Sequence, residues 1–238
     1  MSSAVLVSGQ LRTWSQCLPT LQWACFRKME DPHFYISCAN DEQANDAYLI
    51  GKHYAPEKVH IEIVDQPAFD DADKYLPSSL HAPYTISVPP KSILAQAWQM
   101  NRVYDLAMNN GAEKHDTFIR CRPDLWMTDF ILSRREKPIW ENSVSSPWWG
   151  RFAGCNDRFA VMGRVAASHY FTLYSNLNML LDLGCPLHPE SLLLAQLETN
   201  GVEVHHTLNA VFSTLRLNGE RRFPEIQAQE IAEYARSK

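Results

Sequence analysis

Two arginines and an aspartate follow an apolar stretch in the middle of the chain. The segment reads Asp116-Thr-Phe-Ile-Arg120-Cys-Arg122-Pro-Asp124, so an apolar run ends directly in charges. Arg120, Arg122 and Asp124 share one parity, and an extended chain points them to the same side. Such charges are costly to bury unless they pair with each other or with a ligand. They are either a structural Arg–Asp pair that closes a sheet, or a site in which arginines bind a diphosphate and Asp124 binds a divalent metal or a ribose hydroxyl.

A second polar segment lies near the start of the chain. Ser8-Gly9-Gln10-Leu11-Arg12 follows the apolar run at residues 4–7. Glycine permits a sharp turn, free N–H groups at a helix start favour an anion, and Arg12 adds a guanidinium that binds phosphate in a bidentate manner. An ordinary strand-to-helix turn with a solvated arginine accounts for the same residues. The segment is neither a Walker loop nor a dinucleotide fingerprint.

Two later segments add carboxylates. Asn156-Asp157-Arg158 combines a turn-forming pair with an arginine, and His188-Pro189-Glu190 places an imidazole and a carboxylate at a predicted helix start. Both have a structural explanation, because Asn and Asp favour turns and the helix dipole favours Glu in a first turn. Trp148 and Trp149 are adjacent in a predicted loop, where such a pair can stack on a sugar face.

The elements that must position these residues follow an alternating order. Short apolar runs bounded by turn residues are typical of buried strands. They occur at residues 4–7, 33–38, 59–64, 116–121 and 202–206. Helical spacing of apolar residues predicts helices. These lie at residues 12–29, from Asn40-Asp41 (the expected cap) toward Ile50, at 92–109, 164–183 and 189–199, and from Pro224 onward. Repeated β-α units predict an α/β fold with a parallel sheet, whose sites lie at the strand ends.

Residues 66–90 break this order. The stretch has five prolines, an acidic cluster and no sustained period, so it predicts a long irregular loop. Loops of this length are usually functional, and this one is expected to fold over a ligand. It contains Asp71-Ala72-Asp73, but acidic loop residues are usually solvated, and we expect no metal there.

Composition excludes several classes of function. With 238 residues we expect one domain, and a net charge of -5 disfavours nucleic acid as a partner. No window approaches the roughly 18 apolar residues of a membrane span, so no integral membrane segment is expected. Six scattered cysteines predict buried free thiols in a reducing, cytoplasmic compartment. The histidines lack zinc spacing and no G-x-S-x-G elbow is present.

The motifs taken in order resemble a known family. The start S-G-Q-L-R-T, the strand end I-R-x-R-P-D-L, the segment N-D-R-F-A-x-x-G and the helix start H-P-E-S-L-L resemble small GT-A-type glycosyltransferases of polysaccharide and viral glycan assembly. The resemblance covers roughly residues 4–200. It implies a single-domain, Rossmann-type αβα sandwich with a mostly parallel sheet. Residues 1–125 would form the nucleotide-binding half, and residues 126–238 the acceptor half with the C-terminal helices.

The resemblance also implies roles for the polar residues. A nucleotide-diphosphate sugar donor would contact Ser8, Gly9, Gln10, Arg12, Arg120, Arg122 and Asp124. Asp124 would take the position of the residue that holds Mn²⁺ or Mg²⁺ on the diphosphate. The sequence departs from the commoner Asp-x-Asp pattern, however, because it has one carboxylate where the family usually has two. A single carboxylate holds a divalent ion less firmly, whereas arginines can neutralise the leaving diphosphate directly.

The acceptor side of the site follows in the same way. Asp157 or Glu190 would be the general base, and Arg158, His188, Trp148 and Trp149 would contact a glycan or glycoprotein acceptor. The sequence therefore predicts a glycosyltransferase. Two alternatives stay open: another nucleotide-dependent transferase, such as a nucleotidyl- or sulfotransferase, and a non-catalytic carbohydrate-binding protein that retains the fold.

Overall fold

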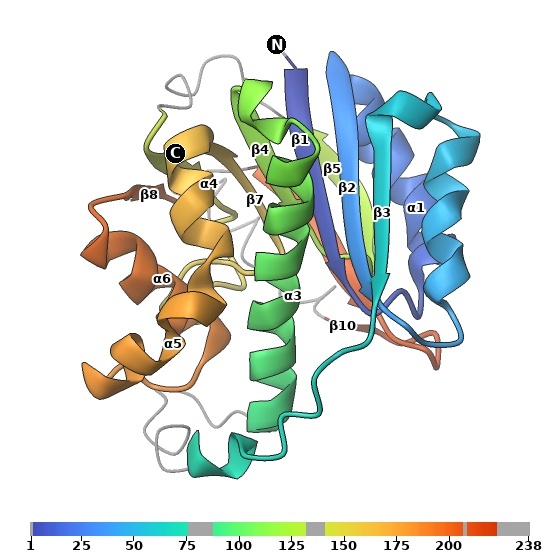
Figure 1. Cartoon of the computed structure of the whole chain (residues 1–238). Coiled ribbons are helices and arrows are strands. Elements are labelled where there is room, and N and C mark those ends of the chain that lie inside the picture. The colour runs from blue at the N-terminus through green and yellow to red at the C-terminus, as the bar shows by residue number, and fades with distance from the viewer. Residues whose placement is uncertain (1, 76–87, 132–140, 207–208, 223–238) are drawn as a thin grey trace.

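The computed structural model describes residues 2–75, 88–131, 141–206 and 209–222. These residues form a layer of helices on each side of a central sheet (Figure 1). The sheet has seven strands in the order β3-β2-β1-β4-β7-β6-β8. Their bounds are β1 Ser2–Gly9, β2 Asp31–Ala39, β3 Val59–Val64, β4 Thr117–Cys121, β6 Ser143–Ser145, β7 Phe159–Gly163 and β8 Glu203–His205.

Most pairings in this sheet are parallel. β1, β2, β3 and β4 run in one direction, and β6 pairs with β8 in parallel. β7 is antiparallel to both of its neighbours, β4 and β6. The predicted α/β fold with a mostly parallel sheet is therefore confirmed. Because β1 and β4 are adjacent and parallel, with Val7 opposite Cys121, the polar segments that follow them leave the sheet at the same edge.

Alternation along β1 divides the core into two parts. Ala4 and Leu6 point to one face, where they pack with α3 (Pro90–Asn109), α4 (Arg164–Phe171), α5 (Leu173–Asp182) and α6 (Pro189–Thr199). Val5 and Val7 point to the other face, against α1 (Trp14–Ala24) and the 3₁₀ segment Ala44–Lys52. All four side chains are fully buried. This explains the continuous apolar run at residues 4–7, which is typical of a strand covered on both faces.

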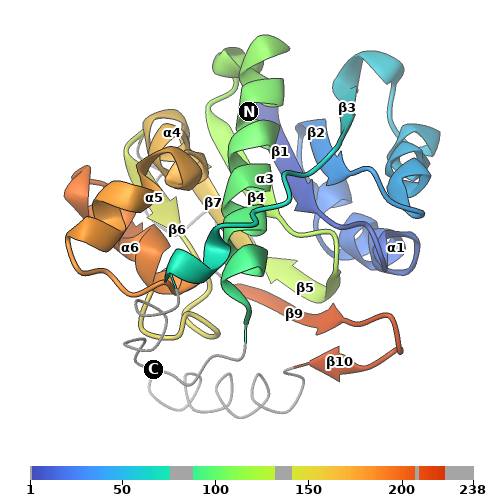
Figure 2. The same cartoon turned by 60° about the horizontal axis from the view of Figure 1, so that its bottom comes forward.

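A second, smaller sheet was not predicted from the sequence. It has the order β10-β9-β5 and consists of β5 Leu125–Ile131, β9 Asn209–Leu215 and β10 Arg221–Arg222. Figure 2 shows it below the strand ends of the large sheet. It is attached to α1, since Thr20 Oγ1 accepts from the backbone N–H of Met127 at 3.1 Å. The sheet brings the segment after β9 to the edge where β1 and β4 end.

Three of the predicted helices differ from those in the structure in their bounds or type. Residues 164–183 form two helices rather than one, because the chain breaks at Thr172, whose hydroxyl donates to the Ser168 carbonyl at 2.6 Å. The first helix begins at Trp14 and ends at Ala24, with Pro19 inside it. The segment toward Ile50 is a 3₁₀ helix that begins after Gln43 and has no side-chain cap. Asp41 instead accepts from the N–H of Gln43 in a preceding turn at 3.0 Å.

The remaining predictions fall partly outside the described residues. Within the loop at 66–90, residues Ala72–Tyr75 form a 3₁₀ turn, and residues 76–87 lie outside the described part. The helix predicted from Pro224 also lies outside it. All six cysteines are free thiols, and all but Cys185 are buried. Among the helices of the described ranges, none combines the length and apolar character needed to cross a membrane.

A buried histidine lies at the opposite edge of the sheet, where β2 and β4 begin. His115 is 1% exposed, its Nε2 lies 3.4 Å from the Tyr35 hydroxyl, and its ring centroid lies 4.7 Å from that of His33. Burial, followed by the nearby charge of His33, lowers the pKa of His115 from 6.5 to about 4. The folded protein therefore keeps this imidazole neutral at a pH where the unfolded chain protonates it.

We expect the free energy of unfolding to fall as the pH is lowered from 6.5 toward 4. The unfolded state binds more protons across this window, so acid favours unfolding. Urea unfolding at pH 7 and pH 5 measures the effect, and His115→Leu should reduce the difference between the two values. His53→Leu, at an exposed position, is the matched control. An unchanged pH dependence in His115→Leu would contradict the assignment.

Candidate functional site

Arg120 joins the ends of β1 and β4 to the segment that carries Asp157. It is 1% exposed, and its Nη1 donates to Ser8 Oγ at 2.6 Å and to the Ser8 carbonyl at 3.3 Å. Its Nε donates to the Asp157 carbonyl at 3.2 Å. The structure thus brings Ser8, Arg120 and Asp157 together, as the sequence predicts. Because these donors bond to protein oxygen atoms, Arg120 holds the end of β1 and the segment with Asp157 together inside the protein.

Gly9 lets the first polar segment lie against the second. Its φ is +140°, a region that side chains with a Cβ rarely adopt, and an added Cβ would lie 3.2 Å from Cδ of Pro123. The turn after β1 therefore packs directly on Arg122-Pro123-Asp124. Gln10 and Arg12, which continue this turn, are exposed.

Arg122 and Asp124 form a bidentate ion pair at the exit of β4. Arg122 Nε donates to Asp124 Oδ1 at 3.0 Å, and Nη2 donates to Oδ2 at 2.7 Å. The two side chains are 20% and 13% exposed. Such pairs have a fixed planar geometry, so Asp124 orients Arg122. The other guanidinium nitrogen, Nη1, lies 3.6 Å from Asp157 Oδ2.

This geometry bears on whether Asp124 can hold a divalent cation. Both of its carboxylate oxygens accept from a guanidinium, and a cation placed on them would lie against that positive charge. Within the described ranges, no three His, Cys, Asp or Glu side chains are placed to share a metal ion. These residues fit a carboxylate that holds an arginine and do not fit a Mn²⁺ or Mg²⁺ ligand set.

The turn before β7 presents Asp157 and Arg158. Asn156 is buried, and its Oδ1 accepts from the N–H groups of Arg158 at 2.9 Å and Phe159 at 3.2 Å. The preceding loop is unusual, since Phe152 and Ala153 have φ values of 45° and 61°. Left-handed backbone at residues other than glycine is often found at functional sites.

Asp157 is surrounded by donors and cations. Its side chain is 4% exposed, Gln96 Nε2 donates to Oδ2 at 2.5 Å, and Arg158 Nη1 lies 3.5 Å from Oδ1. Burial alone would raise the pKa of Asp157, but Arg158, Arg122 and Gln96 outweigh it and lower the pKa below its usual value. Asp157 is therefore ionised at neutral pH.

Glu190 lies beside this group and has the opposite shift. It occupies the first turn of α6, where Oε1 lies 3.1 Å from Arg158 Nη2 and Oε2 lies 3.2 Å from His188 Nε2. Burial, followed by the negative charge of Asp157, raises the pKa of Glu190 to about 8. Two neighbouring carboxylates with diverging pKa values are typical of acid–base sites.

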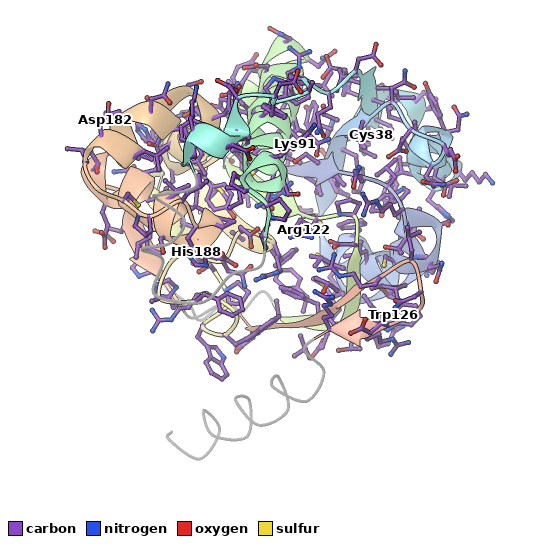
Figure 3. All side chains as sticks on the ribbon, turned by 90° about the horizontal axis from the view of Figure 1, so that it is seen from below. Cys38, Lys91, Arg122, Trp126, Asp182 and His188 are labelled. Atoms are coloured by element: carbon purple, nitrogen blue, oxygen red, sulfur yellow. The ribbon has the colours of Figure 1, made fainter. Side chains whose placement is uncertain are left out.

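His188 supports this arrangement from the start of α6. Its Nδ1 accepts from the N–H of Ser191 at 3.3 Å, so Nε2 carries the proton and donates toward Glu190. The structure thus groups Arg158, His188 and Glu190, all predicted from the sequence, around Asp157. Figure 3 looks onto this edge and shows Arg122 near its centre, with His188 toward α6 and Lys91 at the start of α3.

The two tryptophans occupy different environments. Trp149 is 4% exposed, donates Nε1–H to the Ala210 carbonyl at 3.0 Å and lies against Phe212 with ring centroids 4.4 Å apart. It anchors the small sheet to the core, and its burial argues against contact with a sugar. Trp148 is only partly buried and keeps some exposed surface. The predicted stacking of both rings on one sugar is therefore not supported for Trp149.

Sequence reasoning missed two polar residues at this edge. Gln96 lies on α3, whose sequence shows only helical periodicity, so nothing marks this glutamine as special. Arg216 follows β9, and the N–H of Leu215 donates to the Asp124 carbonyl at 2.8 Å. The apolar run Ala210-Val-Phe212 could have identified β9 as a strand, and with it the position of Arg216.

Comparisons with known proteins show the fold. No protein-family model matches the chain, and no curated protein matches it in sequence. An active-site mutant of LgtC is similar in structure, with 9% sequence identity and a TM-score of 0.50 over 86% of this chain and 72% of that one. The galactosyltransferase LgtC in complex with donor and acceptor sugar analogues gives 8% identity and a TM-score of 0.49 over 86% and 73%. The chain has the fold of the GT-A glycosyltransferases.

Proposed function

We propose that this protein transfers a sugar from a nucleotide-diphosphate donor to a hydroxyl of a glycan or glycoprotein acceptor. The observation that carries the proposal is the cluster at one sheet edge, where Arg122 and Arg158 surround two carboxylates with opposite pKa shifts. The GT-A fold supports a sugar nucleotide as the donor. In open α/β sheets ligands bind beyond the carboxyl ends of the strands, which is where this cluster lies.

The donor side of the proposal rests on positive charge. Departure of a nucleoside diphosphate builds negative charge on phosphate oxygens, and preorganised cations lower the barrier to that step. Arg122 is fixed by Asp124 and remains 20% exposed, so its position is set before a ligand arrives. Ser8, Gly9, Gln10 and Arg12 line the adjacent turn. Because the side chains at Asp124 do not fit a metal ligand set, we derive no step through Mn²⁺ or Mg²⁺.

The acceptor side requires a group that takes up a proton. We assign this role to Glu190, because proton transfer is most efficient when the base has a pKa near the working pH. Asp157 is a weaker base, since its pKa is lowered, and its charge instead holds Arg122 and Arg158 in place. His188 orients the Glu190 carboxylate, and Trp148 and Arg158 are the proposed contacts to the acceptor.

We expect a nucleotide-diphosphate sugar to stabilise the protein against heat. A ligand at about one hundred times its dissociation constant adds roughly 2.7 kcal/mol to the free energy of unfolding. Thermal unfolding with UDP-, GDP-, dTDP- and CMP-sugars, each with and without Mn²⁺, measures this effect. A shift that does not depend on Mn²⁺ would agree with the arginine-rich site.

The same screen distinguishes the alternatives. Stabilisation by a donor, with no transfer to any hydroxyl acceptor, would indicate a non-catalytic binding protein. Stabilisation by a nucleoside triphosphate or a sulfonucleotide alone would indicate another nucleotide-dependent transferase. No shift with any nucleotide would contradict the proposal.

A further inference from the structure

Arg216 is a half-buried arginine whose guanidinium forms no ion pair with the residues that the structure describes. It directly follows β9, in the turn that leads to β10. Among the described residues, its buried Nε has no hydrogen-bond partner, and no carboxylate forms an ion pair with it. A buried N–H of a charged group that lacks an acceptor is unfavourable. Such a group in a native structure calls for an acceptor from outside the protein, which a water or a ligand oxygen supplies.

Two backbone contacts place Arg216 at the candidate site. The preceding residue, Leu215, donates its N–H to the Asp124 carbonyl at 2.8 Å, and its own carbonyl accepts from the Thr13 hydroxyl at 3.3 Å. The small sheet therefore holds Arg216 against both polar segments, the one after β1 and the one after β4. Asp124 is the carboxylate whose charge acts on it, and Arg122, Arg158 and Arg222 act on it as like charges.

The charges around Arg216 do not balance. The other three arginines of the cluster bind protein oxygen atoms: Arg122 binds Asp124, Arg158 binds Glu190, and Arg120 binds Ser8. The cluster contains three carboxylates, those of Asp124, Asp157 and Glu190, and the raised pKa of Glu190 leaves it largely protonated at neutral pH. The cluster therefore carries an excess of positive charge, and Arg216 forms no ion pair with a carboxylate of the described residues. A guanidinium matches phosphate oxygens in a bidentate geometry.

We propose that Arg216 binds the diphosphate of the nucleotide donor, with its guanidinium donating to the phosphate oxygens. The proposal rests on the sugar-transfer function proposed above. It adds a positive group from the small sheet to those supplied by the large sheet. A ligand held in this way contacts groups from the turns after β1, β4 and β9 at once.

Titration calorimetry at fixed salt tests the proposal with four probes: inorganic pyrophosphate, UDP, GDP and uridine. Arg216→Ala should weaken the binding of pyrophosphate, and of whichever of UDP and GDP binds the wild type, by about 10- to 100-fold, the range for charge-assisted hydrogen bonds. The affinity for uridine should not change. Arg216→Lys should recover part of the loss. Arg221→Ala is the matched control, since this exposed arginine of the same hairpin lies over the Trp126 ring at 4.0 Å.

A second measurement separates ligand binding from a structural role. Without ligand, Arg216→Ala should be at least as resistant to thermal unfolding as the wild type, because it removes an unpaired buried donor and a like charge. A structural arginine would give a lower Tm and equal losses for every probe, which would overturn the proposal. Unchanged pyrophosphate and diphosphate affinity in Arg216→Ala would also overturn it. Arg216-dependent pyrophosphate binding with no affinity for any nucleotide would support the anion site and contradict sugar transfer.

Discussion

Glu190→Gln is expected to lower kcat/KM for sugar transfer by roughly 10²- to 10⁴-fold, the usual contribution of a general base. The pKa of Glu190 is raised to about 8, so kcat/KM of the wild type should rise with pH and level off near that value. In Glu190→Gln this rise should be absent. Steady-state kinetics from pH 6 to pH 9 measures both effects.

Matched variants show whether the effect is specific. Glu203→Gln changes an exposed glutamate that also pairs with a histidine, with its Oε2 3.4 Å from His205 Nε2, and it should leave kcat/KM unchanged. Asp157→Asn tests the alternative base. A wild-type profile that is flat between pH 6 and pH 9, together with a large loss in Asp157→Asn, would assign the base to Asp157, whose pKa is lowered.

The stability of Glu190→Gln checks that this variant folds. Glu190 has a folded-state pKa above the ordinary 4.5, so folding favours the protonated form. Its unfavourable contribution appears as the pH rises above 4.5 and is complete above about 8. Glu190→Gln cannot ionise, so its free energy of unfolding relative to the wild type should increase with pH. A loss of activity combined with a gain of stability at pH 9 cannot be attributed to misfolding.

Five of the seven strands of the large sheet, all but β6 and β7, could be predicted from the sequence because their signals are local. The strand at residues 4–7 is an apolar run between turn residues, and Arg120, Arg122 and Asp124 follow another such strand. Since parallel strands end at the same edge, the contact between Ser8 and Arg120 follows from topology. His188 and Glu190 were identified by their place at the start of α6.

The remaining parts of the site depend on contacts between distant segments. The pair between Arg122 and Asp124 was one of two alternatives, and shared parity could not decide between them because the strand ends at Cys121. β5 pairs with β9, which begins 78 residues after β5 ends (Ile131 to Asn209), and no local pattern specifies such a partner. Arg216 therefore could not be placed before the small sheet was known. The opposite pKa shifts of Asp157 and Glu190 likewise arise from burial, from charges on other segments of the chain and, for Asp157, from a hydrogen bond with Gln96 of α3.

Gly154→Ala is expected to reduce the free energy of unfolding by roughly 3 kcal/mol, the upper part of the range for overpacking a rigid site. A Cβ at this position would lie 2.1 Å from the carbonyl oxygen of Glu190 and 2.7 Å from the backbone nitrogen of Ser191. These are backbone atoms at the start of α6, so no flexible side chain can move aside. The N–H of Cys155 donates to the same Glu190 carbonyl at 2.9 Å and fixes the approach.

Two other glycines serve as controls for this effect, measured by urea unfolding. Gly51→Ala adds a methyl group with no atom within 4 Å, so it should change stability by less than about 0.5 kcal/mol or increase it slightly. Gly184 has a φ of +85° and open space around it, so Gly184→Ala isolates the conformational cost of about 1 kcal/mol. Gly154→Ala should exceed both, and it should also lower kcat/KM because relief of the clash displaces Glu190. A Gly154→Ala protein as stable as Gly51→Ala would mean that the loop and α6 are not in contact, and the position of Glu190 beside Asp157 would lose its support.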